Sequence, residues 1–232
     1  MRLRVTPVDG VVVVVPSGFD LRRVPAFVEE HRGWVEKALE EVGAQPGGGV
    51  DPSSRPERIA VAAIDRVWDL EWHPTDSSHI AIEEGPFRLR ISGPIEEAGL
   101  WREALRRWLI ERGREHLPGW VEEMSALLRL RVDRITIRCQ RTRWGSYTAR
   151  PGRDGTISLN AQLLFLSHRL VRYVILHELC HAVHPNHSPA FWALMRTHEP
   201  ESDRLRSELR SAHRQVPRWV LARSSSEPRG AS

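Results

Sequence analysis

The chain has 232 residues, of which 41% are hydrophobic and 28% charged, with 34 basic against 30 acidic side chains. This composition suffices for one substantial core, and arginines interleaved with acids along most of the chain do not indicate nucleic-acid binding, the C-terminal tail excepted. Two cysteines, Cys139 and Cys180, exclude a scaffold built on several disulfides, and we expect both to be reduced.

The N-terminal residues show neither a secretory signal nor a membrane span. The opening MRLRVTPVDG lacks an apolar stretch of about 7 to 15 residues. The longest aliphatic run nearby, residues 11–15, is far shorter than the roughly 18 to 20 residues needed to cross a bilayer. We therefore expect a cytoplasmic protein without a membrane span.

The N-terminal region is expected to form a β-hairpin followed by a helix. Residues 2–8 and 11–15 flank Asp9-Gly10, a dipeptide that tolerates positive φ, and this pattern predicts two paired strands. Apolar residues then recur at helical spacing over 24–42, and a glycine follows them. This spacing predicts an amphipathic helix.

A linker, a small sheet and a long helix are predicted next. The stretch 43–56 is rich in Gly, Pro and Ser and is interpreted as a linker or long exposed loop. Short alternating runs predict an antiparallel sheet. The runs are 58–64, 67–72, 79–82 and 87–91. A helical pattern starts near Ile95 and meets Pro118, which is expected to kink or split it before a second part over 120–128.

Strands, a helix and a tail complete the chain. Alternation over 134–139 and 156–160 predicts two strands, which a polar loop over 140–154 separates. A helix is predicted over 167–184. The residues from about 214 onward have little to bury and are expected to be disordered.

A metal-binding pattern lies on the predicted helix 167–184. His177 and His181 stand four residues apart, so both rings lie on one helical face about 6 Å apart and can reach one ion. Glu178 points off that line, where its carboxylate can take a proton from a zinc-bound water. Zinc sites in enzymes usually have three protein ligands, so a third ligand is required.

Two histidines are candidates for the third ligand, His184 and His187. In a straight helix His184 would lie about 10.5 Å from His177 along the axis, and Pro185 disfavours helical backbone at the residue before it. A turn over 182–185 would let His187 approach the ion from another direction, so ligand geometry favours His187. Metzincins have a glycine at the position of His184, which argues against that clan.

A simpler interpretation makes His177, Glu178 and His181 ordinary members of an amphipathic helix, since this five-residue pattern also arises by chance. The apolar lead-in 170–176, the proline after the motif and the third histidine favour a metal site. A charged glutamate between two buried histidines would otherwise be costly. Cys180 is interpreted as a small buried hydrophobe rather than a fourth ligand.

These motifs resemble the YgjP-like zinc metallopeptidases, which are distantly similar to SprT-type and other gluzincin-like proteins. The resemblance covers roughly residues 1–197. It rests on matching order and spacing of Arg143–Ser146, Ile157–Asn160, Tyr173–His181, and Pro185–Ser188 with Phe191-Trp192. The resemblance implies that His177, His181 and His187 bind zinc and that Glu178 is the catalytic acid/base. The family pattern usually has a cysteine where this chain has Tyr147.

Substrate-facing residues are expected beside the metal. Arg143, Trp144 and Asn160 are candidates because loops near a site often contact the ligand, although apolar packing explains Trp144 equally well. Under the first functional hypothesis the protein hydrolyses peptide bonds. A strand edge at 156–159 would then align the peptide.

Two other functions stay open. The resemblance also carries a nucleoside triphosphate pyrophosphatase assignment, with Arg141 and Arg143 holding phosphate, although both can equally be solvent-facing charges. Alternatively the zinc is structural, and the arginine-rich tail over 204–229 binds nucleic acid or a protein partner. A structural site would usually have a fourth protein ligand.

The sequence as a whole predicts an α+β zinc hydrolase with Zn²⁺ as cofactor. Residues 1–95 would form the hairpin, helix and small antiparallel sheet, and residues 96–200 a minimal zincin-like core that carries the HExxH helix. Residues 201–232 would form a basic, partly disordered tail. The expected substrate is a peptide or protein, or else a nucleoside triphosphate, and nothing in the sequence indicates the oligomeric state.

Overall fold

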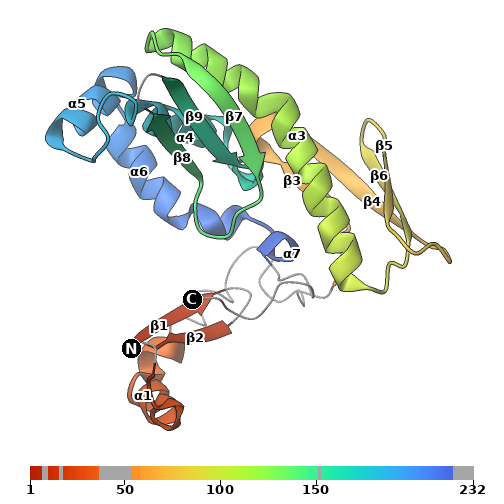
Figure 1. Ribbon diagram of the computed structural model, residues 1–232. Coiled ribbons are helices and arrows are strands. Elements are labelled where there is room, and N and C mark those ends of the chain that lie inside the picture. Colours follow the sequence, from red (N-terminus) through yellow and green to blue (C-terminus); the bar gives the residue numbers. More distant parts are fainter. Residues whose placement is uncertain (7–9, 16–17, 37–53, 151–152, 222–232) are drawn as a thin grey trace. The chain divides into compact units, whose positions relative to one another are not determined.

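The computed structural model describes residues 1–6, 10–15, 18–36, 54–150 and 153–221 (Figure 1). The chain forms two compact units, one of residues 1–55 with 217–223 and one of residues 56–216 with 224–232. The small sheet predicted within 1–95 therefore belongs to the second unit. Among the described residues, no helix combines the length and the apolar character that a membrane span requires.

The first unit contains the predicted hairpin. Strands β1 (Arg2–Thr6) and β2 (Gly10–Val14) pair antiparallel, with Thr6 opposite Gly10. The hairpin is thus confirmed, but Gly10 belongs to the second strand rather than to the turn. Residues 7–9 lie outside the described part of the chain.

Short helical segments and a 3-10 turn accompany the hairpin in the first unit. Helix α1 (Val24–Glu30) follows the turn η1 (Leu21–Arg23), has a proline in its first turn, and ends at His31. Residues 32–36 are helical again. The remainder of the helix predicted over 24–42 and most of the predicted linker lie outside the described residues. The short α7 (Arg218–Leu221) also belongs to this unit.

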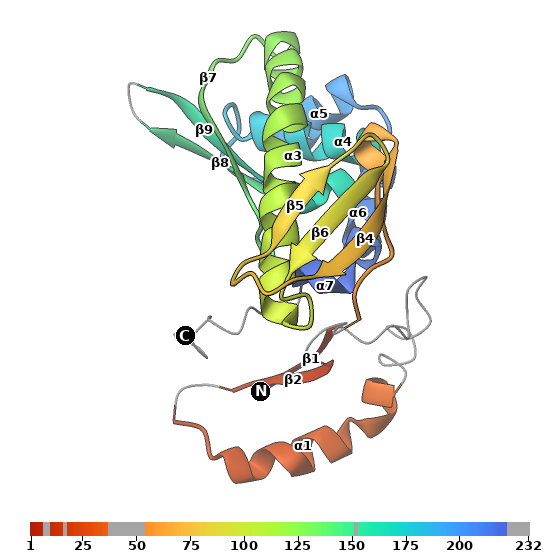
Figure 2. The same ribbon diagram turned by 90° about the vertical axis from the view of Figure 1, so that its right-hand side faces the viewer.

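The second unit begins with a four-stranded sheet in the order β3-β4-β6-β5, of which Figure 2 shows β4, β6 and β5 side by side. Its strands are β3 (Arg58–Val61), β4 (Arg66–Pro74), β5 (Ala81–Glu84) and β6 (Arg88–Gly93). The predicted antiparallel arrangement is wrong for one pair, because β4 and β6 run parallel. A tight turn pairs β6 with β5, and the fully buried Leu89 and Ile91 place β6 centrally beside β4. Alternation of apolar and polar residues identifies strands, but it does not determine which strands pair with one another.

The long helix α3 (Ala98–Leu127) lies beside this sheet and continues unbroken through Pro118 (Figure 2). Two tryptophan pairs in edge-to-face contact join the helix to the sheet: Trp68 with Trp108, and Trp72 with Trp101. The helix is therefore not split, as the sequence had suggested. A proline removes one helical hydrogen bond, but the fully buried Leu117 and Val121 anchor the helix on both sides of it.

The second sheet has the strand order β7-β9-β8. Its strands are β7 (Val132–Arg138), β8 (Gly145–Arg150) and β9 (Arg153–Asn160), and β9 runs parallel to β7 and antiparallel to β8. The predicted loop over 140–154 thus contains a strand, which lacks apolar alternation because it lies at a sheet edge. The predicted strand edge at 156–159 is also wrong, since these residues belong to the central strand.

Helix α4 carries the metal-binding pattern through the middle of the second unit. It spans His168–Cys180, begins after the capping hydroxyl of Ser167, and packs against α3, β8 and β9. The turn η3 (Ala161–Phe165) joins it to β9, and α5 (Pro189–His198), α6 (Ser202–Ser211) and the turn η4 (Ala212–Gln215) follow it. Both α5 and α6 pack against α4. Part of the predicted tail over 201–232 is therefore a helix packed on the core through the buried Ser202 and Leu205.

Candidate active site

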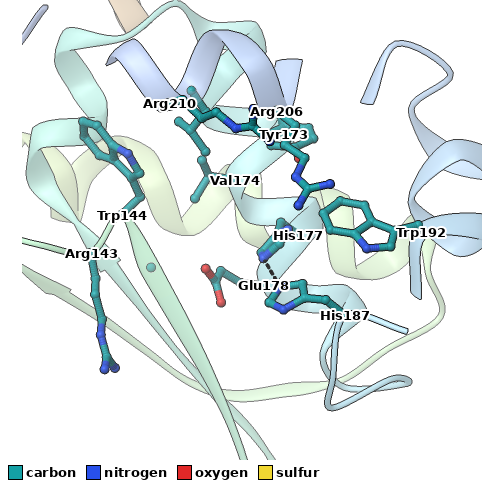
Figure 3. Close-up of a pocket in the computed structure, with 12 residues that line it drawn as sticks. Arg143, Trp144, Tyr173, Val174, His177, Glu178, His187, Trp192, Arg206 and Arg210 are labelled. Carbon is teal, nitrogen blue, oxygen red and sulfur yellow. Dashed lines mark hydrogen bonds between the residues drawn. The ribbon is translucent and has the colours of Figure 1, made fainter. Parts of the chain in front are cut away.

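The three predicted ligand histidines come from the end of α4 and the segment after it. His177 lies in the last turn of α4, which ends at Cys180, and His181 is the residue that caps it. The chain then turns back, and the Ser188 hydroxyl caps the start of α5. His187 consequently lies beside His177 (Figure 3). The helix is shorter than the predicted 167–184, and its earlier end allows this return.

The three imidazoles form a compact cluster. One ring nitrogen from each of His177, His181 and His187 lies within 4.8 Å of the other two, and Nε2 of His177 is 3.0 Å from Nε2 of His187. The fully buried Phe191 on α5 contacts all three rings, with centroid distances of 5.0, 4.8 and 4.9 Å. Packing against one fixed aromatic ring therefore holds the three donors together.

His184 contributes its backbone rather than its ring. Nδ1 of His181 lies 3.1 Å from the carbonyl oxygen of His184. In the tautomer that donates this hydrogen bond, Nε2 of His181 keeps its lone pair for a metal ion. Of the two candidates for the third position, the structure brings the ring of His187, and not that of His184, into the cluster.

Charge and spacing at the cluster suit a divalent metal ion. Burial, the neighbouring histidines and Arg206 lower the pKa of His177 to about 3, and burial also lowers the pKa of His187. Neutral imidazole is the form that binds metals. Two such nitrogens on a tetrahedral zinc ion, each at about 2.0–2.1 Å, would lie about 3.3 Å apart. This is close to the 3.0 Å between His177 and His187, so the donor set fits zinc.

Glu178 lies beside the cluster and is only 8% exposed. Burial raises the pKa of its carboxyl to about 7, against the opposing effects of a backbone hydrogen bond from Tyr147 and the charge of Arg143. Gly145, at the start of β8, packs directly on this side chain, since a Cβ at residue 145 would lie 2.8 Å from Cγ and 3.0 Å from Oε1 of Glu178. The missing side chain is what lets β8 approach the carboxylate.

A pocket of about 460 Å³ opens beside His177, His187 and Glu178 (Figure 3). It is bounded by the start of β8 and the loop before it, by α4, and by α5 and α6. Its other lining residues are Arg143, Trp144, Gly145, Tyr173, Val174, Trp192, Arg206, Leu209 and Arg210. The metal motif gives no indication of α6, although residues 206, 209 and 210 have the i, i+3, i+4 spacing of one helix face.

The three predicted substrate-binding residues occupy different surroundings. Arg143 and Trp144 line the pocket, and the Trp144 ring stacks on His213 with centroids 4.3 Å apart. Asn160 does not line the pocket and is 1% exposed. Its amide donates to the backbone carbonyls of Gln140 and Arg143 at 2.7 and 2.8 Å. Asn160 therefore holds the loop that carries the other two residues.

Two further residues from the motif regions have packing roles. Cys180 is fully buried, burial raises the pKa of its thiol to about 11, and its sulfur is not part of the described metal-binding group. The ring of Tyr147 lies over Gly155 on the neighbouring strand, where any side chain at residue 155 would collide with it. The tyrosine thus fills the space above a strand glycine.

Comparison with known proteins identifies a family. No curated protein matches the chain. The family model described as "YgjP-like, metallopeptidase domain" matches residues 1–212. That range includes the histidine cluster, Glu178 and the whole of α6. The chain therefore belongs to the YgjP-like family of metallopeptidase domains.

Proposed function

We propose that this protein is a zinc-dependent metallopeptidase. His177, His181 and His187 hold the ion, and Glu178 acts first as general base and then as general acid in peptide-bond hydrolysis. The observation that carries the proposal is the convergence of three imidazoles beside a buried carboxylate, with His177, His187 and Glu178 lining one pocket. Membership of a metallopeptidase family supports it independently.

The number of donors supports a catalytic rather than a structural metal site. Among the residues that the structure describes, the metal-binding group has three members, His177, His181 and His187. Catalytic zinc typically has three protein ligands, whereas structural zinc usually has four. The chemistry supplied by a bound zinc ion is polarisation of the scissile carbonyl and activation of water.

Glu178 is suited to transfer the proton. With a pKa of about 7, its carboxyl can accept a proton from water and return it to the leaving amine near neutral pH. Proton transfer requires both partners within hydrogen-bond reach, so the carboxylate must be held in place. The backbone hydrogen bond from Tyr147 and the contact with Gly145 supply that restraint.

We place the substrate peptide along β8 rather than along 156–159. β8 lies at the edge of its sheet and borders the pocket at Gly145. Sheet edges bind extended peptides through main-chain hydrogen bonds. Trp144, fixed against His213 just before the strand, forms the adjoining wall. Asn160 acts indirectly, because it positions the loop and not the substrate.

The test compares wild type with Glu178→Gln at equal zinc content, with an unfolded protein as substrate. We expect hydrolysis to fall by about 10²- to 10⁴-fold, the usual contribution of a general base, while zinc stays bound. Glu122→Gln, at an exposed glutamate on α3, is the matched control and should keep full activity. Equal activity of Glu178→Gln and wild type would exclude the assigned role. A wild type that holds zinc but cleaves no peptide would favour a non-catalytic zinc module.

A second candidate is a nucleoside triphosphate pyrophosphatase that uses the same site. It is favoured by three arginines in the pocket wall, Arg143, Arg206 and Arg210, because guanidinium groups bind phosphate oxygens in pairs. Arg141, the other predicted phosphate ligand, does not line the pocket. Release of pyrophosphate from nucleoside triphosphates by wild type, and not by Glu178→Gln, would support this candidate.

A further inference from the structure

Two arginines on α6 face the pocket without an acidic partner among the described residues. Arg206 and Arg210 stand one helical turn apart and both line the pocket. The guanidinium of Arg206 lies over the ring of Trp192, 4.1 Å from its centroid. Arg204, on the same helix but outside the pocket, instead pairs with Glu201 at 3.1 Å. The pocket-facing arginines thus keep their charge available for a ligand.

The position of this pair limits the kind of ligand that it can bind. Arg206 extends toward His177 and Trp192, whereas Arg143 extends on the other side of Glu178 (Figure 3). Two guanidinium groups in a partly apolar pocket match one carboxylate, which accepts paired N–H···O bonds from arginine. Contact with the Trp192 ring restricts the motion of Arg206, so less side-chain entropy is lost when it binds.

We propose that Arg206 and Arg210 form a subsite for the carboxylate of an acidic residue near the scissile bond, so that the protein prefers peptides containing glutamate or aspartate. This inference rests on the proposed metallopeptidase function. A peptide carboxylate fits better than a triphosphate, because one carboxylate needs only the α6 pair, whereas the several phosphate groups would also call on Arg143, which extends on the other side of Glu178 (Figure 3). A single carboxylate at α6 leaves the Glu178 side of the pocket to the peptide backbone.

The test measures binding without turnover, in the zinc-loaded Glu178→Gln protein. Two peptides that differ only in one residue, glutamate or glutamine, are titrated by calorimetry. We expect the glutamate peptide to bind about tenfold more tightly, which corresponds to about 1.4 kcal/mol. Arg206→Gln in the same background should abolish this preference, and Arg206→Lys should restore only part of it because lysine lacks the planar pair of donors. Arg204→Gln is the matched control and should leave the preference unchanged.

The outcomes separate this inference from the proposed function. Equal binding of the two peptides would overturn the subsite, even if wild type cleaves both. A glutamate preference that Arg206→Gln does not remove would also overturn it. A preference that depends on Arg206 would support the subsite, even if wild type shows no hydrolysis and the metallopeptidase proposal fails. A nucleoside triphosphate that binds through Arg206 while the two peptides bind equally would assign the arginines to phosphate and overturn the proposal.

Discussion

The α4 side of the pocket is buried and closely packed, whereas the α6 side is exposed and charged. On the α4 side, Glu178 is 8% exposed and Gly145 leaves no space beside it. On the α6 side, Arg206 and Arg210 are exposed residues. Glu178 is thus held by packing on the α4 side, and the exposed His187 is held against the rings of His177 and Phe191, whereas Arg206 and Arg210 have more freedom to move. Substitutions should therefore have large effects on the first side and graded effects on the second.

The largest effect is expected from His187→Ala. Removing one of three donors should lower zinc affinity by more than the about 10- to 100-fold that is typical when a supporting residue of a metal site is lost. The loss of zinc affinity is measured as the zinc content per chain after dialysis against a competing chelator. His184→Ala is the matched control, because it keeps the backbone carbonyl that faces His181. If both variants retain zinc like wild type, residue 187 is not a ligand.

Gly145→Ala tests the close packing on Glu178 directly. A methyl group there would lie 2.8 Å from Cγ of Glu178, so the carboxylate or β8 must move. A displacement of this kind can cost about 100-fold in activity, and we expect that loss with the zinc content unchanged. Gly119→Ala, where a Cβ would meet nothing within 4 Å, is the control. Full activity of Gly145→Ala would show that the contact does not position the carboxylate.

Asn160→Ala tests the support beneath the loop before β8. The change removes the side-chain donor to the carbonyls of Gln140 and Arg143 and the acceptor of the Gln140 and Gln162 backbone N–H groups. The Gln140 carbonyl keeps the Gln162 side chain as a donor. We expect the free energy of unfolding to fall by about 2–4 kcal/mol, measured by urea titration. Gln215→Ala, at an exposed residue, should change it little. An unchanged unfolding midpoint for Asn160→Ala would mean that the loop is held by other contacts.

The buried Glu178 should make the stability of the metal-free protein depend on pH. Because its pKa rises from 4.5 to about 7 on folding, the folded state binds the proton more tightly, and stability is lost as the pH rises through that interval. Metal-free Glu178→Gln lacks this loss, so its free energy of unfolding should exceed that of wild type by about 1–3 kcal/mol above pH 7. The two proteins should converge below about pH 4.5. A difference that does not change with pH would argue that the carboxyl titrates normally.

The smallest effect is expected from Arg210→Gln on the α6 side. This side chain is exposed, so the free energy of unfolding should change by less than about 0.5 kcal/mol. Binding of an acidic peptide should weaken only severalfold, because Arg206, stacked on Trp192, remains. Thermal unfolding and peptide titration check the two statements. A large loss of stability in Arg210→Gln would show that the side chains on the α6 side are packed as closely as those on the α4 side.

The local sequence pattern predicted the structure correctly where the spacing of residues along the chain is enough to determine how they are arranged. The spacing of His177 and His181 on one helix, and the need for a turn before His187, anticipated the cluster that the structure shows. The hairpin around Gly10 and the continuous apolar face of α4 were equally visible. In each case the relevant contacts are made within one short continuous segment of the chain.

The sequence pattern gave wrong predictions where contacts with distant segments of the chain determine the secondary structure or the strand pairing. The polar strand β8 carries no alternation of its own and forms because β9 pairs with it. The helix through Pro118 stays whole because its buried neighbours Leu117 and Val121 hold it against the rest of the unit. The parallel pairing of β4 with β6 depends on the order of strands in space.

The sequence by itself determined the composition of the candidate site, since the identity and spacing of three histidines and one glutamate place a possible metal-binding group at one helix end. Only the tertiary structure decided how that site is enclosed. It brought Gly145 of β8 onto Glu178 and placed Arg206 of α6 across the pocket. The physical reason is that a helix fixes neighbours three and four residues apart, whereas contacts between segments far apart in the chain depend on how the whole core packs.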